Sequence, residues 1–202
     1  MSEAHLAEPH HAISDAALDT LFREAHTTRK WLDTPVSPAL LMAIYDLMRW
    51  GPTATNITPA RIVFVTSPDA KERLKPHLDA GNVRQSMAAP VTAIIGYDLD
   101  FPRHLAKLYS PEAPSWFGDA EANKTHALRN GSLQGGYFIL AARALGLDCG
   151  PMGGFNHDGV DAEFFAGTQI KSNFLCNLGY GAPGGTRPRN PRLTFDEACK
   201  IL

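Results

Sequence analysis

The stretch 122–145 constrains this chain most, because it has the pattern of one long helix. Its second half, which includes YFILAARAL (137–145), is apolar almost all round. A helix of that kind has to be buried on every side. Gly131, Gly135 and Gly136 would each cost the helix about 1 kcal/mol relative to alanine. We therefore expect another backbone or a flat ligand to approach them closely, and Gly146 to cap the helix.

Capping residues predict the other helices. Ser14 is the N-cap of a first helix, and Ser37 with Pro38 begins a second that ends near Trp50. Thr194 and Glu197 form a capping box for a terminal helix. Short helices are also expected after Ser67 and over 81–89 and 158–165.

Apolar runs predict strands at 61–66, 90–97 and 173–180, the first of them buried, with a short strand over 147–150. Because these strands are scattered among more numerous helices, the predicted class is an α+β or three-layer domain, not a regular βαβ series. At about 150 residues per domain, 202 residues suit a single domain over 14–202. Residues 1–13 are predicted to be a frayed tail, although His5, His10 and His11 leave a metal-binding tail as the alternative.

Composition excludes several classes of function. A net charge of −2 does not favour nucleic acid as a partner. The three cysteines include no CxxC pair, so disulfide frameworks and zinc sites are not expected. A reduced, cytoplasmic setting is expected instead. No signal peptide and no membrane-spanning run of about 18 apolar residues is predicted.

Familiar catalytic motifs are missing from the sequence. GYGAPG (179–184) matches G-x-G-x-x-G after a strand, but the prolines that follow prevent the helix which a dinucleotide site needs. No GxSxG, HExxH, EF-hand or Walker sequence occurs. The sequence therefore gives no basis for a hydrolase or a metal-dependent enzyme.

Four short segments carry polar groups suited to ligand binding, although each also has an ordinary structural explanation. Arg187 and Arg189 lie two apart in an extended tail, so they are predicted to hold one phosphate dianion, unless the tail is merely solvated. HTTRKW (26–31) offers phosphate donors at the end of a helix. GPTATN (51–56) offers groups that suit a heterocycle edge, and PMGGF (151–155) offers backbone N–H groups.

Taken in order, these segments resemble the nitroreductase family over roughly residues 14–202. Within it the chain is most similar to the malonic semialdehyde reductases of the Rut pathway of pyrimidine degradation. The matching stretches are WGPTATNITPARIVF, GNVRQSMAAPVTAI, ALGLDCGPMGGF, KSNFLCNLGYG and PRLTFDEA. The resemblance implies a mostly antiparallel sheet surrounded by helices, and a homodimer with an extended C-terminal arm. It also implies one FMN at each subunit interface, with NADH or NADPH as reductant.

The resemblance also assigns cofactor-binding residues by position. An N-terminal segment binds FMN, a C-terminal pair holds its phosphate, two residues on a helix bind the pyrimidine edge, a loop comes from the other subunit, and the backbone N–H of a turn approaches flavin N5. In that order, these residues are His26, Thr27 and Arg29; Arg187 and Arg189; Asn82 and Gln85; Pro52, Thr53, Ala54 and Asn56; Gly153 and Gly154.

Three residues depart from the family pattern. Ala25 stands where many members have Arg, Gln85 where they have Lys, and Thr58 where they have Gln. Without the Lys, one cation that would stabilise reduced flavin is lost, so the resemblance does not determine the redox potential of the bound flavin.

The implied chemistry is ping-pong hydride transfer through the flavin, which explains the missing triad. The expected acceptor is malonic semialdehyde, giving 3-hydroxypropanoate. A broad nitro or quinone reductase and a non-catalytic flavin-binding protein remain alternatives. The irregular segment 98–121 is either a pocket wall or a partly buried surface loop. If it is a wall, its residues Phe101, Trp116 and Phe117 line the substrate slot.

Overall fold

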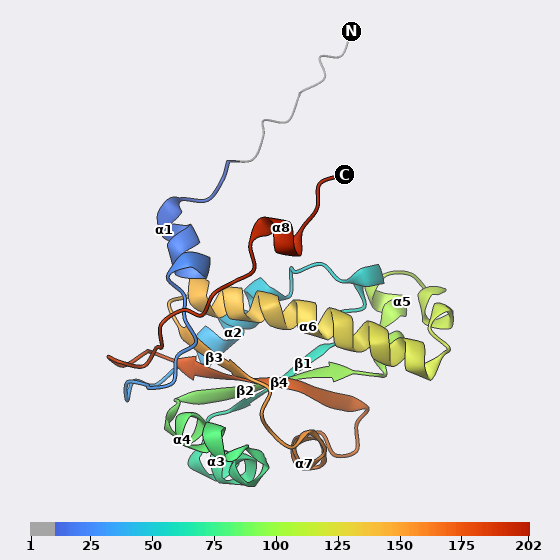
Figure 1. Cartoon of the computed structure of the whole chain (residues 1–202). Helices are drawn as coiled ribbons and strands as arrows, with labels where there is room; N and C mark the ends of the chain where they lie inside the picture. The colour runs from blue at the N-terminus through green and yellow to red at the C-terminus, as the bar shows by residue number, and fades with distance from the viewer. Residues whose placement is uncertain (1–10) are drawn as a thin grey trace.

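The structure is a computed structural model that describes residues 11–202 (Figure 1). Most of the predicted N-terminal tail, including His5 and His10, therefore lies outside the described residues. Residues 11–13, the described part of the predicted tail, form neither helix nor strand and are exposed. Among the described helices, none combines the length and apolar character needed to cross a membrane.

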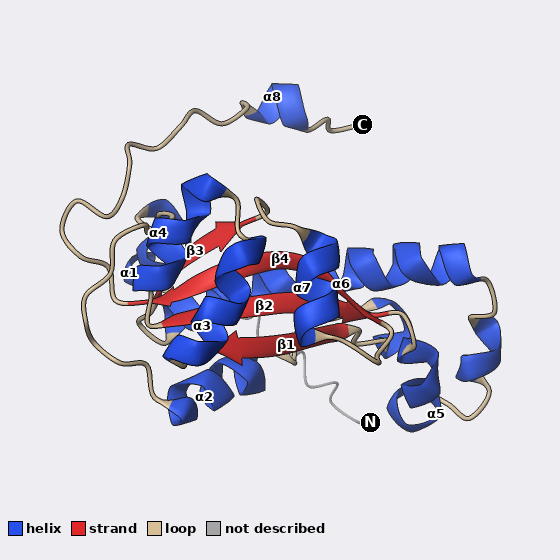
Figure 2. Ribbon diagram, turned by 90° about the horizontal axis from the view of Figure 1, so that it is seen from below, coloured by secondary structure: helices blue, strands red, loops and turns tan. Residues whose placement is uncertain are grey.

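A four-stranded antiparallel sheet forms the centre of the molecule, with strand order β1-β2-β4-β3 (Figure 2). Its strands are β1 (Ala60–Val65), β2 (Val91–Asp98), β3 (Asp148–Met152) and β4 (Ile170–Gly179). Every residue of β2 is buried, because β2 lies in the middle of the sheet with helices on both faces. The predicted α+β class and antiparallel sheet are confirmed.

Helices cover both faces of this sheet (Figure 1). One face carries α6 (Ala120–Ala144) and α2 (Pro38–Met48), and the other carries α3 (Pro68–Leu74), α4 (Ala80–Ala88) and α7 (His157–Phe164). Alternate residues of β2 serve the two layers, as a pleated strand requires. Ala93 and Ile95 pack with α2 and α6, whereas Ile94 packs with Leu74 and Val160 on the opposite side.

The long helix α6 is confirmed, but it buries one face instead of its whole circumference. Two of its glycines lie against aromatic side chains of the sheet, which explains them without a ligand. A Cβ on Gly131 would come within 2.9 Å of Tyr97 Cβ, and one on Gly135 within 2.5 Å of the Phe174 ring. Nothing lies within 4 Å of the corresponding point on Gly136. The outer face instead leaves apolar side chains exposed, among them Leu128, Leu133 and Tyr137.

The first strand differs from its prediction because it lies at an edge. β1 pairs only with β2, and five of its six residues are half-buried. Ala60 donates its backbone N–H to Gln134 Oε1 at 2.9 Å, away from the sheet. A run such as RIVFV looks the same whether one or both sides of a strand are paired, so its sequence could not distinguish an edge from the centre.

The predicted caps are present. The side chains of Ser14 and Ser37 accept backbone N–H groups at the starts of α1 (Asp15–Leu18) and α2, and Thr194 with Glu197 caps α8 (Phe195–Ala198). Short turns of helix complete the chain. They are η1 (Asp19–Arg23), η2 (Ala54–Asn56), η3 (Lys75–His77), η4 (Phe101–His104), α5 (Leu105–Leu108) and η5 (Ala113–Trp116).

The C-terminal arm leaves the sheet after β4 and runs to α8, well away from the other helices (Figure 2). No helix opens at Gly184 within the described arm, and the next one begins at Phe195. The prolines after GYGAPG thus keep the arm extended, as predicted.

Candidate functional site

The N-terminal segment 27–32 lies between β3 and the start of the C-terminal arm. Thr28 N donates to Cys149 O at 2.9 Å, and Arg29 N donates to Gly185 O at 2.9 Å. A further bridge joins Trp31 to Gly181. These contacts bring two segments that are about 150 residues apart in sequence to the same end of the sheet.

A cavity of about 250 Å³ opens where these segments meet α4. Its lining contains four cationic side chains and no carboxylate: Arg29, Lys30, Arg84 and Arg187. The helix is tied to the N-terminal segment, because the Trp31 indole donates to Gln85 O at 3.1 Å. Such a cluster of cations suits a phosphate dianion.

The structure thus brings together Arg29, Gln85 and Arg187, three of the residues assigned from sequence. Lys30 and Arg84, which also line the cavity, were missed by sequence reasoning. Each is adjacent in sequence to an assigned residue, and that proximity to Arg29 and Gln85 was the available signal.

Arg187 and Arg189 do not act as a pair in this structure. Arg187 lines the cavity. Arg189 instead donates to the carbonyl oxygens of Arg23, at 2.6 Å, and Ala25, at 3.0 Å. These carbonyls end the first helical segment, where a cation is favoured. Side chains two residues apart in an extended tail point the same way only when neither bonds to another group nearby. Arg189 bonds to the Arg23 and Ala25 carbonyls and therefore turns away from Arg187.

His26 and Thr27 lie beside this cavity in the chain but do not line it. Thr27 forms a parallel bridge with Cys149. The next residue, Thr28, is buried, and its hydroxyl has no hydrogen-bond partner among the described residues. A buried hydroxyl without a partner is costly unless something else satisfies it.

Asn82 and Gln85 lie one turn apart on α4 and face the turn that follows β3. Asn82 Nδ2 donates to Gly154 O at 2.8 Å, and Gln85 Nε2 donates to Asn82 Oδ1 at 2.7 Å. A Cβ added to Gly153 would meet nothing within 4 Å, so its surroundings are open. The assigned helix residues and the assigned turn are therefore in direct contact.

The loop with Pro52, Thr53, Ala54 and Asn56 lies elsewhere, against α6 and α5. Ala54 N donates to the side chain of Asn130 at 2.8 Å, and Asn56 Nδ2 donates to Leu108 O at 2.9 Å. None of the four assigned loop residues lines the cationic cavity. One chain alone therefore does not join this loop to that cavity.

This loop is also strained. All the described non-glycine residues with positive φ lie in it: Thr55 at 51°, Asn56 at 51° and Thr58 at 35°. Such conformations cost about 1–3 kcal/mol each and cluster at functional sites.

Of the three aromatic residues assigned to a substrate slot, Phe101 lies in the interior. It is fully buried beside Ile57 and Leu105, and its ring packs edge-on against Phe117 at 5.1 Å. Trp116 is exposed and pairs edge-on with Tyr109 at 5.8 Å. In the single chain, Trp116 is the one whose ring faces outward.

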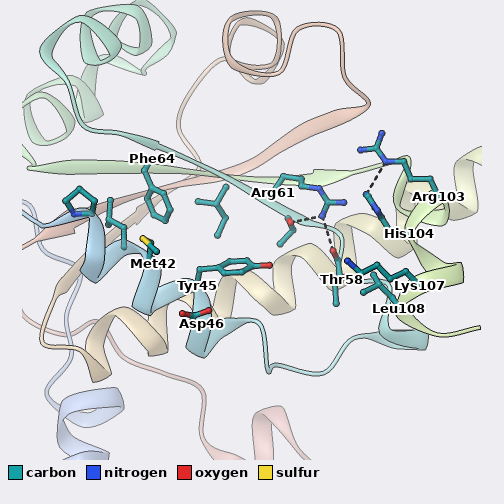
Figure 3. A pocket seen from close by; sticks show the side chains of 14 residues that line it. Met42, Tyr45, Asp46, Thr58, Arg61, Phe64, Arg103, His104, Lys107 and Leu108 are labelled. Carbon is teal, nitrogen blue, oxygen red and sulfur yellow. Dashed lines mark hydrogen bonds between the residues drawn. The ribbon is translucent and has the colours of Figure 1, made fainter.

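A second, larger cavity, about 810 Å³, lies along the outer side of β1, between α2 and α5 (Figure 3). Its floor is apolar and includes Met42, Tyr45 and Phe64. Among the residues compared with the family's FMN site, only Thr58, which departs from the family pattern, lines this cavity.

Charged residues surround one end of this cavity (Figure 3). The buried carboxylate of Asp98 accepts from Arg61 Nη2 at 2.8 Å and Arg103 Nη2 at 3.4 Å. Arg103 Nε donates to His104 Nε2 at 3.1 Å. Burial lowers the pKa of His104, and the nearby guanidinium groups of Arg61 and Arg103 lower it further.

The sequence profile of the nitroreductase family matches residues 22–180. A Stenotrophomonas maltophilia protein, provisionally named NADH dehydrogenase/NAD(P)H nitroreductase, is 61% identical over 193 residues, covering 95% of this chain and 98% of its own. A Caulobacter protein of the same name is 57% identical over 192 residues, covering 94% and 98%.

Solved structures show the same fold. A provisionally named nitroreductase from Bacillus subtilis superposes with a TM-score of 0.84 at 22% identity, covering 93% of this chain and 99% of its own. Another, from Exiguobacterium sibiricum and in complex with FMN, gives 0.83 at 19% identity, covering 96% and 100%. With a family match over most of its length and relatives above half identity, this chain belongs to the nitroreductase family.

Proposed function

We propose that this chain is an FMN-dependent NAD(P)H oxidoreductase. The observation that carries the proposal is the cationic cavity, in which Arg29, Lys30, Arg84 and Arg187 face one small space without a carboxylate. The phosphate of FMN is a dianion, and guanidinium groups bind such anions in a forked geometry. When bound, FMN would supply the hydride transfer between NAD(P)H and an acceptor.

The chain's own residues would bind and orient the cofactor. The four cations hold the phosphate end. Asn82, Gln85 and the Gly153–Gly154 turn, which contact one another next to that cavity, meet the ring. Thr28, whose buried hydroxyl has no hydrogen-bond partner in the described part of the chain, lies in the same region. His26, Thr27 and Arg189 then contribute by holding the N-terminal segment, not by lining the cavity.

The proposed acceptor is malonic semialdehyde, reduced to 3-hydroxypropanoate. Its support is the likeness of the quoted sequence stretches to that subfamily. Broad reduction of nitro compounds or quinones is the second candidate, because the relatives at 61% and 57% identity carry a nitroreductase name. A cytoplasmic location belongs to this proposal, since the described Cys149, Cys176 and Cys199 are free thiols.

The visible absorption spectrum of the purified protein tests the proposal. We expect flavin bands that bleach when NADPH or NADH is added without oxygen and return when an acceptor follows. Bands that persist with both reductants would indicate a flavin-binding protein without this activity. No bands, even after incubation with FMN, would overturn the proposal. Turnover with malonic semialdehyde, compared with a nitroaromatic and a quinone, decides between the acceptors.

We further propose that the active form is a homodimer. The outer face of α6 and the neighbouring end of α2 expose Leu133, Tyr137, Leu47 and Trp50, the last at 77%. Pairing two copies through this face would bury these side chains and bring the strained loop with Pro52, Thr53, Ala54 and Asn56 to the partner's flavin. Burial of such apolar area favours association.

The C-terminal arm supports the same proposal. Leu193, Phe195, Ile201 and Leu202 are exposed on a segment that stands clear of its own helices (Figure 2). In a dimer, these apolar side chains would bind in the apolar cavity along β1 of the second copy (Figure 3). Sedimentation should show a dimer for the wild type and a monomer with weakened FMN binding for Tyr137→Arg. A monomeric wild type that keeps its flavin would overturn this part.

A further inference from the structure

The helix α4 meets the sheet through a polar side chain. Ser86 is its one fully buried residue, with 1% of its surface exposed, whereas the apolar Val83 and Met87 are only half-buried. The neighbouring helices α3 and α7 instead bury the apolar side chains of Leu74 and Val160 against the sheet. The attachment of α4 therefore depends on hydrogen bonds in a way that the attachment of its neighbours does not.

The Ser86 hydroxyl lies at the end of a buried chain of hydrogen bonds that begins in the sheet. Thr92 on β2 and Asn177 on β4 are directly paired and fully buried. Thr92 Oγ1 donates to Asn177 Oδ1 at 2.7 Å, and Asn177 Nδ2 donates to Ser86 Oγ at 3.2 Å. Ser86 Oγ in turn donates to Met152 Sδ at 3.5 Å. Each of these side chains has a partner, and a satisfied polar network of this kind fixes one arrangement of a core.

The backbone of α4 is also held, at its C-terminal end. Lys71 Nζ, on α3, donates to the carbonyl oxygen of Ser86 at 3.1 Å and to that of Ala89. The last carbonyls of a helix have no partner within the helix, and a nearby cation satisfies them. Lys71 thus fastens the end of α4 to α3, whereas the Ser86 hydroxyl links the helix to the strands beneath it.

Ser86 lies next to the residues proposed to meet the flavin ring. Gln85 precedes it, and Asn82 lies one turn before it on α4. Gln85 Nε2 approaches Met152 Sδ at 4.0 Å, the same sulfur that accepts the Ser86 hydroxyl. A rotation of α4 about its axis would move these side chains together. Because the bonds from the strands to Ser86 resist that rotation, they determine where Asn82 and Gln85 lie.

We infer that Thr92, Asn177 and Ser86 are positioning residues that fix the rotation of α4, so that Asn82 and Gln85 meet the flavin ring in one arrangement. Because the three are buried beneath α4, they act through the helix and not by touching the cofactor. Hydride transfer tolerates little misplacement, since a shift of about 1 Å can cost about 100-fold in rate. This role rests on the proposed function for the flavin, but the attachment of α4 belongs to the chain alone.

Three variants of the full-length chain test this role. Ser86→Ala removes the hydroxyl and leaves the Asn177 amide without its acceptor. The apolar variant combines Thr92→Val, Ser86→Ala and Asn177→Leu, and replacing all the partners by apolar groups of similar shape can be nearly neutral for stability. Ser132→Ala makes the same change as Ser86→Ala at an exposed position of α6 and is the control. All three variants keep Lys71, so the end of α4 stays fastened.

Hydrogen exchange without FMN measures the attachment of α4. The reporter is the Ala89 amide, which donates to Gln85 O at 3.1 Å, and the reference is the Leu145 amide at the end of α6. We expect about tenfold faster exchange at Ala89 in Ser86→Ala, the effect of losing one buried hydrogen bond, and no change at Leu145. Ser132→Ala should match the wild type at both amides. Wild-type exchange at Ala89 in Ser86→Ala would overturn the inference.

The proteins loaded with FMN measure the positioning itself. Ser86→Ala and the apolar variant should both shift the midpoint potential of the flavin to more negative values and change its visible circular dichroism, because the side-chain amides that bind the ring are displaced. The affinity for FMN should fall by no more than about tenfold, since three of the four cavity cations, Arg29, Lys30 and Arg187, lie outside α4.

An apolar variant that unfolds in urea like the wild type, and whose flavin keeps the wild-type potential and dichroism, would overturn the positioning role. If that variant does not fold, the same flavin measurements on Ser86→Ala decide the question. A wild type that binds no flavin would overturn the proposed function, while exchange at Ala89 would still decide whether Ser86 holds α4.

Discussion

Asn130, on the buried face of α6, accepts the backbone N–H of Ala54 through its side-chain oxygen at 2.8 Å. Its nitrogen donates to His126 O at 2.9 Å, so both ends of the amide are used. This bond ties the centre of the longest helix to the loop in which Thr55 and Thr58 adopt positive φ. A strained loop keeps its shape only when the surrounding structure holds it.

Replacing Asn130 should therefore loosen the loop and destabilise the chain. Asn130→Ala leaves the Ala54 N–H without its acceptor, and we expect a loss of about 1–3 kcal/mol in the free energy of unfolding. Urea denaturation measures this loss. Ser132→Ala, two residues away on α6, is the control and should be nearly neutral, because the exposed bonds of its hydroxyl to Leu128 O and Asn173 Nδ2 can be replaced by water. Equal effects of the two substitutions would contradict this role for Asn130.

The two arginines of the arm should differ in their effect on FMN. Arg187→Ala removes a cation from the cavity, so we expect about 10- to 100-fold weaker FMN binding, equivalent to about 1.5–3 kcal/mol. Arg189→Ala removes bonds to the Arg23 and Ala25 carbonyls and should leave FMN affinity near the wild-type value. Fluorescence titration of both variants measures this difference. A larger loss in Arg189→Ala would show that Arg189 binds the phosphate after all.

Two neighbouring glycines of α6 should respond oppositely to the same substitution. Gly135→Ala would force a methyl group against the Phe174 ring, which we expect to cost about 1–3 kcal/mol. Gly136→Ala has open space in the single chain and should gain up to about 1 kcal/mol from helix propensity. Thermal or urea unfolding of the two variants measures this. A destabilising Gly136→Ala would indicate that a second copy packs closely against α6 there.

His104 should make stability depend on pH. Its folded pKa lies below the unfolded value of about 6.5, so the folded state binds fewer protons between these two values. The free energy of unfolding should therefore rise with pH across that window and level off above about 6.5. His104→Gln cannot gain the proton and should remove this part of the pH dependence. Urea unfolding of both proteins from about pH 5 to 8 measures it, and identical pH profiles would exclude His104 as the cause.

Features set by neighbouring residues could be predicted from the sequence. The N-caps at Ser14 and Ser37 and the capping box at Thr194 depend on residues within one turn, and all three are present. The α+β class also follows, because strands scattered among more numerous helices do not make a regular βαβ series, whereas the antiparallel pairing was expected from the family resemblance. That Arg29, Gln85 and Arg187 belong to one site was predicted from the family resemblance, since no local sequence pattern relates segments so far apart in the chain.

Features that depend on a distant partner could not be predicted. The sequence does not show that Arg189 meets the Ala25 carbonyl, or that Phe101 packs inside against Phe117. A backbone or a flat ligand was expected beside the α6 glycines, but the structure places the side chains of Tyr97 and Phe174 there, at Gly131 and Gly135, and nothing within 4 Å at Gly136. In each case, the decisive neighbour is many residues away in the chain.

The two edges of the sheet are unequal, and this limits how molecules can aggregate. The edge at β3 is bordered by the chain's own N-terminal segment through the bridge between Thr27 and Cys149, whereas β1 pairs on one side only. An exposed edge strand is a template on which further chains can add. Because the β3 edge is bordered in this way among the described residues, edge-to-edge addition of free chains would proceed through β1 alone and would end once two sheets have met.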